Sequence, residues 1–282
     1  MNDGIVGPLV STDWLATNLD RKDVKVIDTI FWMPGLGRTL AEEYNDIHIP
    51  GSLLFDLDAV SDTATEIPHM MPSPARFAEM VGLMGIRNSD LVVCADRMGM
   101  MGAPRAWWMF RSFGHDRVVV LDGGVSKWLA EERPTSDQPP TPSPVVFGVT
   151  PQSGFFRSID EITPETEQLV DARDRERYAG NTPEVWPGRR RGHIPGSVNV
   201  PFKSLLNDDL TFKSPDDLRA AFVNAGLDLD RPIVTTCGSG VTACVLTLAL
   251  HMLGKQDMTV YDGAWAEWGL RFDKPVAIGR AG

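Results

Sequence analysis

Short runs of β-branched and apolar residues alternate along the chain with longer segments of helical pattern. The strand-like runs include Val24–Ile27, Leu91–Cys94 and Val118–Leu121, and helix-like segments such as Ala75–Leu83 and Ala103–Phe113 lie between them. Strands that alternate with helices are typical of a parallel sheet with helices on both faces. The pattern therefore predicts an α/β fold.

The chain contains an internal repeat with an offset of 140 to 145 residues. V-D-A at Asp171 repeats the I-D-T at Asp28, H-I-P-G-S begins at both His48 and His193, and D-G-A-W-A-E-W from Asp262 repeats D-G-G-V-S-K-W from Asp122. Similar offsets in the same order predict two copies of one domain of roughly 130 residues. The His residues occur in both copies, so we expect them to cap backbone groups rather than to act in catalysis.

A proline-rich segment separates the two copies. It contains five prolines within eleven residues, in P-T-S-D-Q-P-P-T-P-S-P from Pro134. Such a stretch cannot continue a helix or a central strand, and it is typical of an extended, stiff linker. We expect a first domain over 1–134, a linker over 135–156 and a second domain over 157–282.

One stretch of the second copy has the features of a reactive site. Ile233–Thr236 has the composition of a buried strand, and the apolar run from Val241 to Leu253 is long enough for a buried helix. Cys237 lies between them, on a glycine-containing turn. A thiol is a good nucleophile only when it is ionised, and the positive end of a following helix favours the thiolate.

The residues after this cysteine are suited to surround an anion. Gly238 and Gly240 would let the backbone curl so that several N–H groups point inward, and Ser239 and Thr242 could add hydroxyl donors. The stretch therefore predicts a nucleophilic cysteine in an anion-binding loop. Cys94 and Cys244 have no such context, and we expect them to be small buried hydrophobic residues.

Two families of anion-binding loops do not fit the spacing. A phosphate P-loop needs Lys and then Ser or Thr after its last glycine, and here Val241 follows Gly240. A cysteine phosphatase needs, by resemblance to that family, an arginine six residues after the cysteine, where this chain has Ala243. Phosphate chemistry is therefore disfavoured.

C-G-S-G-V-T-A, residues 237–243, resembles the active-site loop of the rhodanese superfamily of sulfurtransferases, specifically the 3-mercaptopyruvate type. Thiosulfate-preferring members more often carry Arg and Lys where this chain has Gly238 and Ser239. The resemblance extends over essentially the whole chain. It implies two tandem rhodanese-like domains, each a parallel sheet with helices on both faces. Asp96 occupies the position of Cys237 in the first copy, which implies that this copy is catalytically silent and contributes to the wall of the cleft.

The resemblance also implies roles for further residues. Asp58 would form a Cys–Ser–Asp triad with Cys237 and Ser239 and orient the serine. His69 would line the cleft, and Arg177 would hold the anionic end of the substrate. The substrate-binding set implied by the resemblance is Arg177, His69, Gly238, Gly240, Val241, Thr242 and Trp186.

The sequence departs from the family pattern at Trp186. The family commonly has Glu-Pro-Arg-x-Gly ahead of G-H-I-P-G, with that Arg as a second substrate clamp, and this chain reads E-V-W-P-G. Two alternatives are open. One of Arg189, Arg190 and Arg191 substitutes from the next turn, or the pocket takes a bulkier or less charged donor.

Composition narrows the class of protein further. The chain has 282 residues, 43% of them hydrophobic, and a net charge of −11, which argues against binding to nucleic acid or to an anionic membrane surface. It has no apolar run of about 18 residues and no secretory or transit signal, so we expect a cytoplasmic protein. Three cysteines without C-x-x-C spacing argue against a disulfide framework or a zinc site.

The resemblance implies sulfur transfer by double displacement. The thiolate of Cys237 would take sulfur from 3-mercaptopyruvate to form a persulfide, and cyanide or a cellular thiol such as thioredoxin would accept it. No metal or organic cofactor is expected, and we expect a monomer. The alternatives are a thiosulfate:cyanide sulfurtransferase and a persulfide carrier that relays sulfur to a partner protein.

Overall fold

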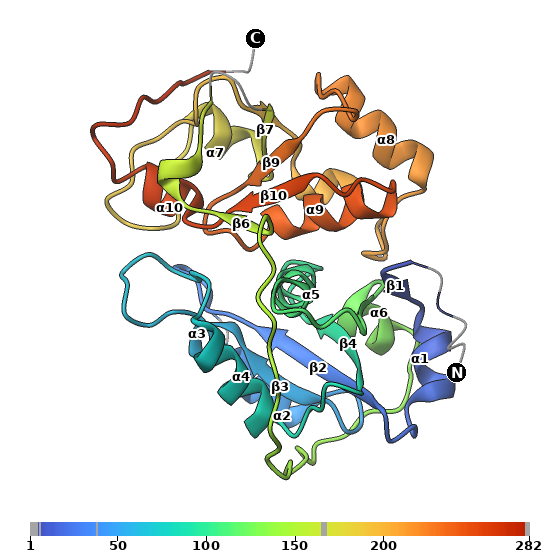
Figure 1. The fold of residues 1–282 in the computed structure, drawn as a ribbon. Coiled ribbons are helices and arrows are strands. Elements are labelled where there is room, and N and C mark those ends of the chain that lie inside the picture. Colours follow the sequence, from blue (N-terminus) through green and yellow to red (C-terminus); the bar gives the residue numbers. More distant parts are fainter. Residues whose placement is uncertain (1–4, 6, 38, 165–167, 280–282) are drawn as a thin grey trace.

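The computed structural model describes residues 5, 7–37, 39–164 and 168–279, and it contains two parallel five-stranded sheets (Figure 1). The strand order is β1-β5-β4-β2-β3 in the first sheet and β6-β10-β9-β7-β8 in the second. The two orders are equivalent, which confirms both the α/β fold and the repeat of one domain. All strand pairs of the two sheets are parallel, as strands connected through helices require.

The first domain contains β1 to β5 and α1 to α6. Its elements are β1 Leu9–Val10, α1 Thr12–Asn18, β2 Val24–Ile30, α2 Leu40–Asp46, β3 Leu53–Asp56, α3 Leu57–Val60, α4 Pro74–Leu83, β4 Leu91–Asp96, α5 Gly102–Ser112, β5 Val118–Leu121 and α6 Gly124–Ala130.

The second domain contains β6 to β10, two short 3₁₀ helices and α7 to α10. Its elements are β6 Phe156–Arg157, η1 Ile159–Glu161, β7 Gln168–Asp171, α7 Arg175–Ala179, β8 Val198–Asn199, η2 Phe202–Leu205, α8 Pro215–Asn224, β9 Ile233–Thr236, α9 Ala243–Met252, β10 Met258–Tyr261 and α10 Ala264–Trp268. The predicted strand before Cys237 and the predicted helix after it are both present.

Successive residues of the central strands serve two different cores. In β4, Leu91 and Val93 pack with α1 and α6, whereas Val92 and Cys94 pack with α4 and α5 on the other face. Because side chains of a strand alternate between its faces, a strand that is apolar at every position must be covered on both sides. Cys94 is fully buried in this core, as predicted.

Helices α5 and α9 form the main apolar contact between the two domains. They pack against each other across the interface (Figure 1), and a single apolar cluster runs from Trp107 and Phe110 of α5 to Leu246 and Leu250 of α9. Buried apolar area of this kind resists separation of the domains. Cys244 lies in this cluster and is fully buried, as predicted.

A segment of each domain crosses to the other domain and is held there by the same motif. The loop after α3 crosses to the second domain, where the N–H of Met71 donates to Asp262 at 2.7 Å. The loop after η2 crosses to the first domain, where the N–H of Phe212 donates to Asp122 at 2.9 Å. The repeated aspartate after the last strand of each domain therefore holds the crossing loop of the other domain.

The repeated histidines have the expected structural role. Nδ1 of His48 lies 2.7 Å from the carbonyl oxygen of Tyr44, and Nδ1 of His193 lies 2.9 Å from that of Tyr178. Each imidazole also stacks on the ring of the same tyrosine. This equivalence in both domains confirms that the two histidines cap neighbouring backbone.

The proline-rich segment is extended and has no helix or strand between Ala130 and Phe156, as predicted. It does not act as a free spacer, because it is hydrogen bonded along the first domain. The N–H of Val145 donates to Gly82 at 2.9 Å, and that of Thr150 donates to Phe113 at 2.8 Å. Phe147 is buried against that domain. The domain limits at 134 and 157 stay predictions.

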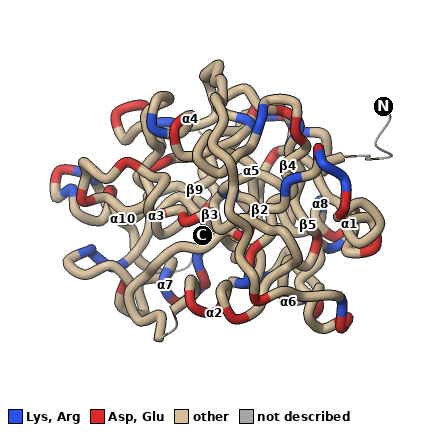
Figure 2. The backbone as a smooth tube through the Cα atoms, turned by 90° about the horizontal axis from the view of Figure 1, so that it is seen from below, with Lys and Arg blue, Asp and Glu red and all other residues tan. Residues whose placement is uncertain are grey.

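Charged residues of both signs are interspersed along the backbone (Figure 2). The excess of acidic residues is therefore distributed over many loops. No helix among the described residues is both long and apolar enough to cross a bilayer.

The docking of the linker predicts the sign of one substitution. Gly82→Ala would ordinarily stabilise a helix by about 1 kcal/mol. Here the added Cβ would lie 2.5 Å from the carbonyl oxygen of Val145, so we expect the free energy of unfolding to fall instead, by about 2 kcal/mol. Urea unfolding measures the difference. Gly37→Ala, at a position with no atom within 4 Å of the added Cβ, is the control, and a stabilised Gly82→Ala variant would contradict the docking.

Candidate active site

Cys237 lies at the carboxyl end of β9, on the loop that leads into α9. This loop lines a cavity of about 670 Å³ between the two domains. Only 1% of Cys237 is exposed, so a ligand reaches the sulfur through this cavity. The position agrees with the general rule that ligands of parallel sheets bind beyond the carboxyl ends of the strands.

Two glycines give the loop its shape. Gly240 has a φ of +76°, and a Cβ there would lie 2.7 Å from the carbonyl oxygen of Asp262, so a side chain is excluded by both strain and contact. At Gly238 a Cβ would lie 2.9 Å from Nη2 of Arg177. The guanidinium therefore lies directly against the loop that carries Cys237.

The corresponding loop of the first domain shows what this backbone surrounds. Asp96 replaces the cysteine there, and its two carboxylate oxygens accept hydrogen bonds from four backbone N–H groups at 2.8 to 3.1 Å. The donors are Met98, Met100, Gly102 and Ala103. Gly99 has a φ of +75°, which matches Gly240. The loop is therefore built to surround a negative charge.

In the second domain two of the four equivalent donors, those of Ser239 and Val241, line the cavity, whereas the N–H of Cys244, which corresponds to that of Ala103, donates to the carbonyl oxygen of Val241 at 3.1 Å. Within the described part of the chain, the backbone N–H groups of Ser239 and Val241 have no acceptor, although they are equivalent to those of Met98 and Met100. Burial raises the pKa of Asp96 to about 6, although the N–H groups of Ala103, Met98 and Met100 oppose the shift. A buried carboxylate in the first domain thus occupies the place that a bound anion would take in the second.

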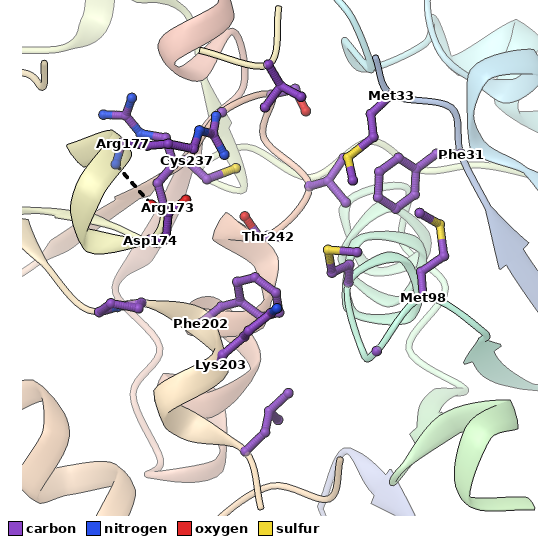
Figure 3. Close-up of a pocket in the computed structure, with 18 of the residues that line it drawn as sticks. Phe31, Met33, Met98, Arg173, Asp174, Arg177, Phe202, Lys203, Cys237 and Thr242 are labelled. Carbon is purple, nitrogen blue, oxygen red and sulfur yellow. Dashed lines mark hydrogen bonds between the residues drawn. The ribbon is translucent and has the colours of Figure 1, made fainter. Parts of the chain in front are cut away.

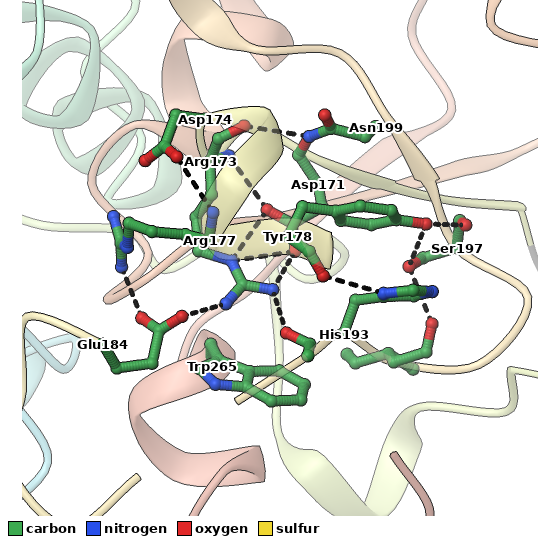
Figure 4. A network of polar contacts seen from close by, with 12 residues as sticks. Asp171, Arg173, Asp174, Arg177, Tyr178, Glu184, His193, Ser197, Asn199 and Trp265 are labelled. Carbon is green, nitrogen blue, oxygen red and sulfur yellow. Dashed lines mark hydrogen bonds and ion pairs between the residues drawn. The ribbon is translucent and has the colours of Figure 1, made fainter. Parts of the chain in front are cut away.

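Two arginines and one glutamate form the charged wall beside Cys237 (Figures 3 and 4). Arg173 is fully buried and contacts both oxygens of Asp171, and its Nη1 lies 2.6 Å from Glu184. Arg177 binds the other oxygen of Glu184 at 2.6 Å. Glu184 thereby fixes both guanidinium groups, and the ring of Trp265 lies 4.6 Å from the Arg173 guanidinium.

Arg173 and Lys203 line the cavity together with Arg177, and sequence reasoning missed both. Arg173 is two residues after the repeated Asp171, a spacing that could have indicated an ion pair. Lys203 lies in η2, and no pattern in the sequence singled it out. The cavity therefore has three cationic side chains on the wall formed by the second domain.

Trp186 lines the cavity, and no arginine of the next turn takes its place. The guanidinium of Arg189 donates to the carbonyls of Ala266 and Pro187, and that of Arg190 donates to carbonyls of the segment 268–274. Neither residue lines the cavity, nor does the exposed Arg191. These contacts disfavour the alternative in which one of these three substitutes from the next turn, and the alternative of a bulkier or less charged donor stays open.

Ser239, His69 and Asp58 form a chain of polar contacts that reaches across the two domains. Ser239 Oγ lies 2.9 Å from Nδ1 of His69, and Nε2 of His69 lies 3.2 Å from Asp58. Asp58 was expected to orient Ser239 itself, but the imidazole lies between them. His69 has a φ of +60°, a strained conformation at the end of the crossing loop that aims its ring at the serine.

The wall formed by the first domain is apolar. Phe31, Met33 and Met98 face the charged wall across the cavity (Figure 3), and Met101 also lines the cavity. Trp186 packs edge-on against both His69, at 5.6 Å between ring centroids, and Trp32, at 5.8 Å. The aromatic rings cover the side of the imidazole.

A buried ion pair between the domains holds the parts of the site together. Arg105 of α5 is completely buried and lies 2.8 Å from Asp262. The same guanidinium donates to the carbonyl of His69 at 2.6 Å and to that of Gly240 at 3.4 Å. The guanidinium of Arg105 therefore fixes both His69, which contacts Ser239, and the turn at Gly240, which follows Ser239.

The chain matches the family described as Rhodanese-like domain over residues 11–131 and 159–271. It is 40% identical to thiosulfate/3-mercaptopyruvate sulfurtransferase 1, mitochondrial, of Arabidopsis thaliana, over 95% of this chain and 78% of that protein. It is 41% identical to thiosulfate sulfurtransferase of Rattus norvegicus, over 97% of this chain and 96% of that protein. The crystal structure of SseA, a 3-mercaptopyruvate sulfurtransferase of Escherichia coli, aligns with a TM-score of 0.83 and 34% identity over 92% of this chain and 99% of that one.

The ion pair between the domains predicts a strong and non-additive effect. Asp262→Asn leaves the guanidinium of Arg105 buried without an anion, so we expect the free energy of unfolding to fall by about 3 kcal/mol. The double variant Arg105→Met, Asp262→Asn removes that uncompensated charge and should lose less than the single variant. Urea unfolding of the native chain, the two single variants Arg105→Met and Asp262→Asn, and the double variant measures the coupling. Additive losses would contradict it.

The buried carboxylate of the first domain predicts a dependence of stability on pH. The pKa of Asp96 is about 6 in the folded protein and 3.8 ordinarily, so the folded state holds this proton more tightly. The stabilisation from Asp96 is complete below about pH 4 and is lost as pH rises through about 6, and it amounts to about 3 kcal/mol.

Unfolding of the native chain and of Asp96→Asn at pH 4 and pH 7 tests this directly. As pH rises, the unfolding free energy of the native chain should fall by about 3 kcal/mol relative to that of Asp96→Asn. The same comparison with the exposed Asp116→Asn should show no such movement. Parallel pH profiles for the native chain and Asp96→Asn would rule out the assignment.

Proposed function

The chain belongs to the rhodanese family and is a sulfurtransferase, and from this premise we propose that Cys237 carries the sulfur as a persulfide from a small anionic donor to a thiol acceptor. The observation that carries the proposal is the comparison of the two loops. The first domain binds the carboxylate of Asp96 with four N–H groups, and the two that correspond to Met98 and Met100 have no acceptor around Cys237 among the described residues of the second domain. A negatively charged outer sulfur would be stabilised by the same donors.

The proposed reaction with 3-mercaptopyruvate has two steps. The thiolate of Cys237 attacks the sulfur of the donor, an S–S bond forms, and the C–S bond breaks with its electron pair on the carbon. The enolate takes a proton and leaves as pyruvate, and the enzyme keeps a persulfide. In the second step an acceptor thiolate attacks the outer sulfur, and Cys237 leaves as the thiolate.

The chain Ser239–His69–Asp58 supports 3-mercaptopyruvate as the donor. With its proton on Nε2, His69 donates toward Asp58 and the carbonyl of Trp32, and its Nδ1 accepts from the hydroxyl of Ser239. Such a relay can move the proton that the donor thiol loses and the enolate gains. When thiosulfate gives up its outer sulfur, sulfite leaves, and no proton has to be transferred. A site for thiosulfate alone would therefore not need the relay.

The charged wall supports a donor with a carboxylate. Arg177 lies against the loop at Gly238, and its planar fork can bind both oxygens of a carboxylate. Lys203 also lines the cavity, near Phe202, and in our proposal it supplies the second cation that Trp186 does not provide. Gly240, Val241 and Thr242 complete the anion-binding loop.

Thiosulfate is the second candidate donor. A curated relative of the same overall similarity is named thiosulfate sulfurtransferase, and the loop N–H groups and Arg177 also suit the anionic end of thiosulfate. A persulfide carrier that relays sulfur to a partner protein is the third candidate. Turnover with a free donor and a free acceptor separates a carrier from an enzyme, because a carrier would load but release slowly without its partner.

The acceptor in our proposal is a cellular thiol such as thioredoxin, and the protein acts as a monomer in the cytoplasm. The exposed ring of Trp32 stands beside the cavity, where an acceptor protein would meet it. The negative charge of the chain and the absence of a spanning helix among the described residues agree with a role away from nucleic acids and membranes.

The relay predicts a loss that depends on the donor. His69→Asn removes the imidazole and keeps a residue that tolerates the positive φ of this position. We expect kcat/KM for 3-mercaptopyruvate to fall about 100-fold, and that for thiosulfate to fall less than about threefold. Steady-state sulfur transfer to cyanide with each donor measures both.

Two further variants make this test interpretable. Cys237→Ser supplies the blank, since it should abolish transfer from either donor. Ser239→Ala should repeat the selective loss of 3-mercaptopyruvate turnover. Equal losses for the two donors would overturn the relay, and a native preference for thiosulfate would overturn the choice of donor while the persulfide at Cys237 remained.

A further inference from the structure

A second cavity, of about 680 Å³, lies at the opposite end of the second sheet from Cys237. Three parts of the chain line it: the end of α5, the linker segment 153–157 and the first residues of β9 and β10. It is therefore bounded by both domains and by the segment between them, the kind of position at which ligand sites are common. Neither the charged wall nor the relay of the active site reaches it.

Arg111 brings an incompletely neutralised cation to this cavity. Its side chain is only 19% exposed, and its nearest carboxylate, Asp116, is 3.8 Å away and 83% exposed. Burial lowers the pKa of Arg111, because so distant and hydrated a partner compensates little of the desolvation. The guanidinium instead lies over the rings of Trp107 and Trp108. A bound anion would supply the missing charge.

The remaining polar groups of the cavity also favour an anion. Arg157 and the exposed Arg231 line it, and the side chain of Arg231 has no partner among the described residues. The acidic residue in the lining, Asp257, is already bound to Lys255 at 2.6 Å. The cavity is thus locally cationic within a chain of net charge −11.

One buried hydroxyl at the cavity lacks a hydrogen-bond partner. Thr259 is 5% exposed, and its Oγ1 has no donor or acceptor within the described part of the chain. A buried polar group without a partner costs about 1 to 3 kcal/mol unless a ligand satisfies it. Next to it the lining is aromatic, with Phe155 packed against Trp108 at 4.4 Å between ring centroids.

We propose that this cavity binds an organic anion that carries a planar apolar group. The arginines bind the anionic end, as guanidinium groups bind phosphates and carboxylates. The hydroxyl of Thr259 supplies a hydrogen bond, and the ring of Phe155 packs against the planar part. The ligand would contact α5, which also carries Arg105 at the active site, and β9, which leads to Cys237.

Calorimetric titration of the full chain with 1-naphthyl phosphate and with inorganic phosphate tests the site. We expect 1-naphthyl phosphate to bind with a Kd of about 1 mM or tighter, and phosphate to bind at least about tenfold more weakly. Arg231→Gln should weaken binding of 1-naphthyl phosphate about tenfold, whereas Arg219→Gln, an exposed arginine on α8, should leave it unchanged.

Two more variants separate the site from the active site and from misfolding. Thr259→Val should weaken binding about threefold without lowering the melting temperature, because its hydroxyl has no partner in the free protein. Arg177→Gln should leave binding unchanged. The proposal is overturned by no binding, by equal affinity for both probes, by loss of binding in Arg177→Gln, or by unchanged affinity in Arg231→Gln.

Discussion

The site depends on a single buried contact, the ion pair of Arg105 with Asp262. The arginine comes from the first domain and the aspartate from the second, and both side chains are buried. Because a buried charge without its partner is costly, this ion pair favours the arrangement of the two domains in which the two residues meet. That arrangement places the imidazole of His69, from one domain, against the hydroxyl of Ser239, from the other. The charged wall and the apolar wall of the cavity likewise come from different domains, so the cleft exists only in the assembled pair.

The two domains solve one structural problem in two ways. A buried guanidinium binds the repeated aspartate in each: Arg173 binds Asp171, and Arg97 binds Asp28. Arg173 lies two residues after its aspartate, whereas Arg97 extends back from the loop after β4, at the position that matches Gly238. The second domain therefore keeps that loop position free of a side chain, and Arg177 occupies the space beside it. The two loops therefore differ in the position of the arginine that binds the repeated aspartate: Arg97 lies within the loop of the first domain, whereas Arg173 lies outside the loop of the second.

Much of this could be predicted from sequence because the determinants are local. The strand and helix patterns, the turn at Cys237 and the short motifs around Asp28 and Asp171 can each be recognised within a few consecutive residues. The contact between His69 and Ser239 could not be predicted in the same way, since the two residues are 170 positions apart and meet only when the domains pack. Arg173 and Lys203 were missed because a charged residue in a loop has the same appearance in sequence whether it is solvated or faces a cavity. The repeated D-G motif at Asp122 and Asp262 was visible, but its role in holding the opposite domain was not.

The carboxylate of Asp96 has a consequence for the stoichiometry of the protein. Gene duplication gave the chain two loops of the same shape, yet one of them is permanently occupied by its own side chain. A mobile anion cannot enter that loop, and no thiol is present there to retain a sulfur atom. Under the proposed function, the protein therefore has two copies of the fold but stores one transferable sulfur per chain. The loop of the first domain contributes rigidity and a wall, while the sulfur transferred in each cycle of the proposed reaction passes through a single atom, Sγ of Cys237.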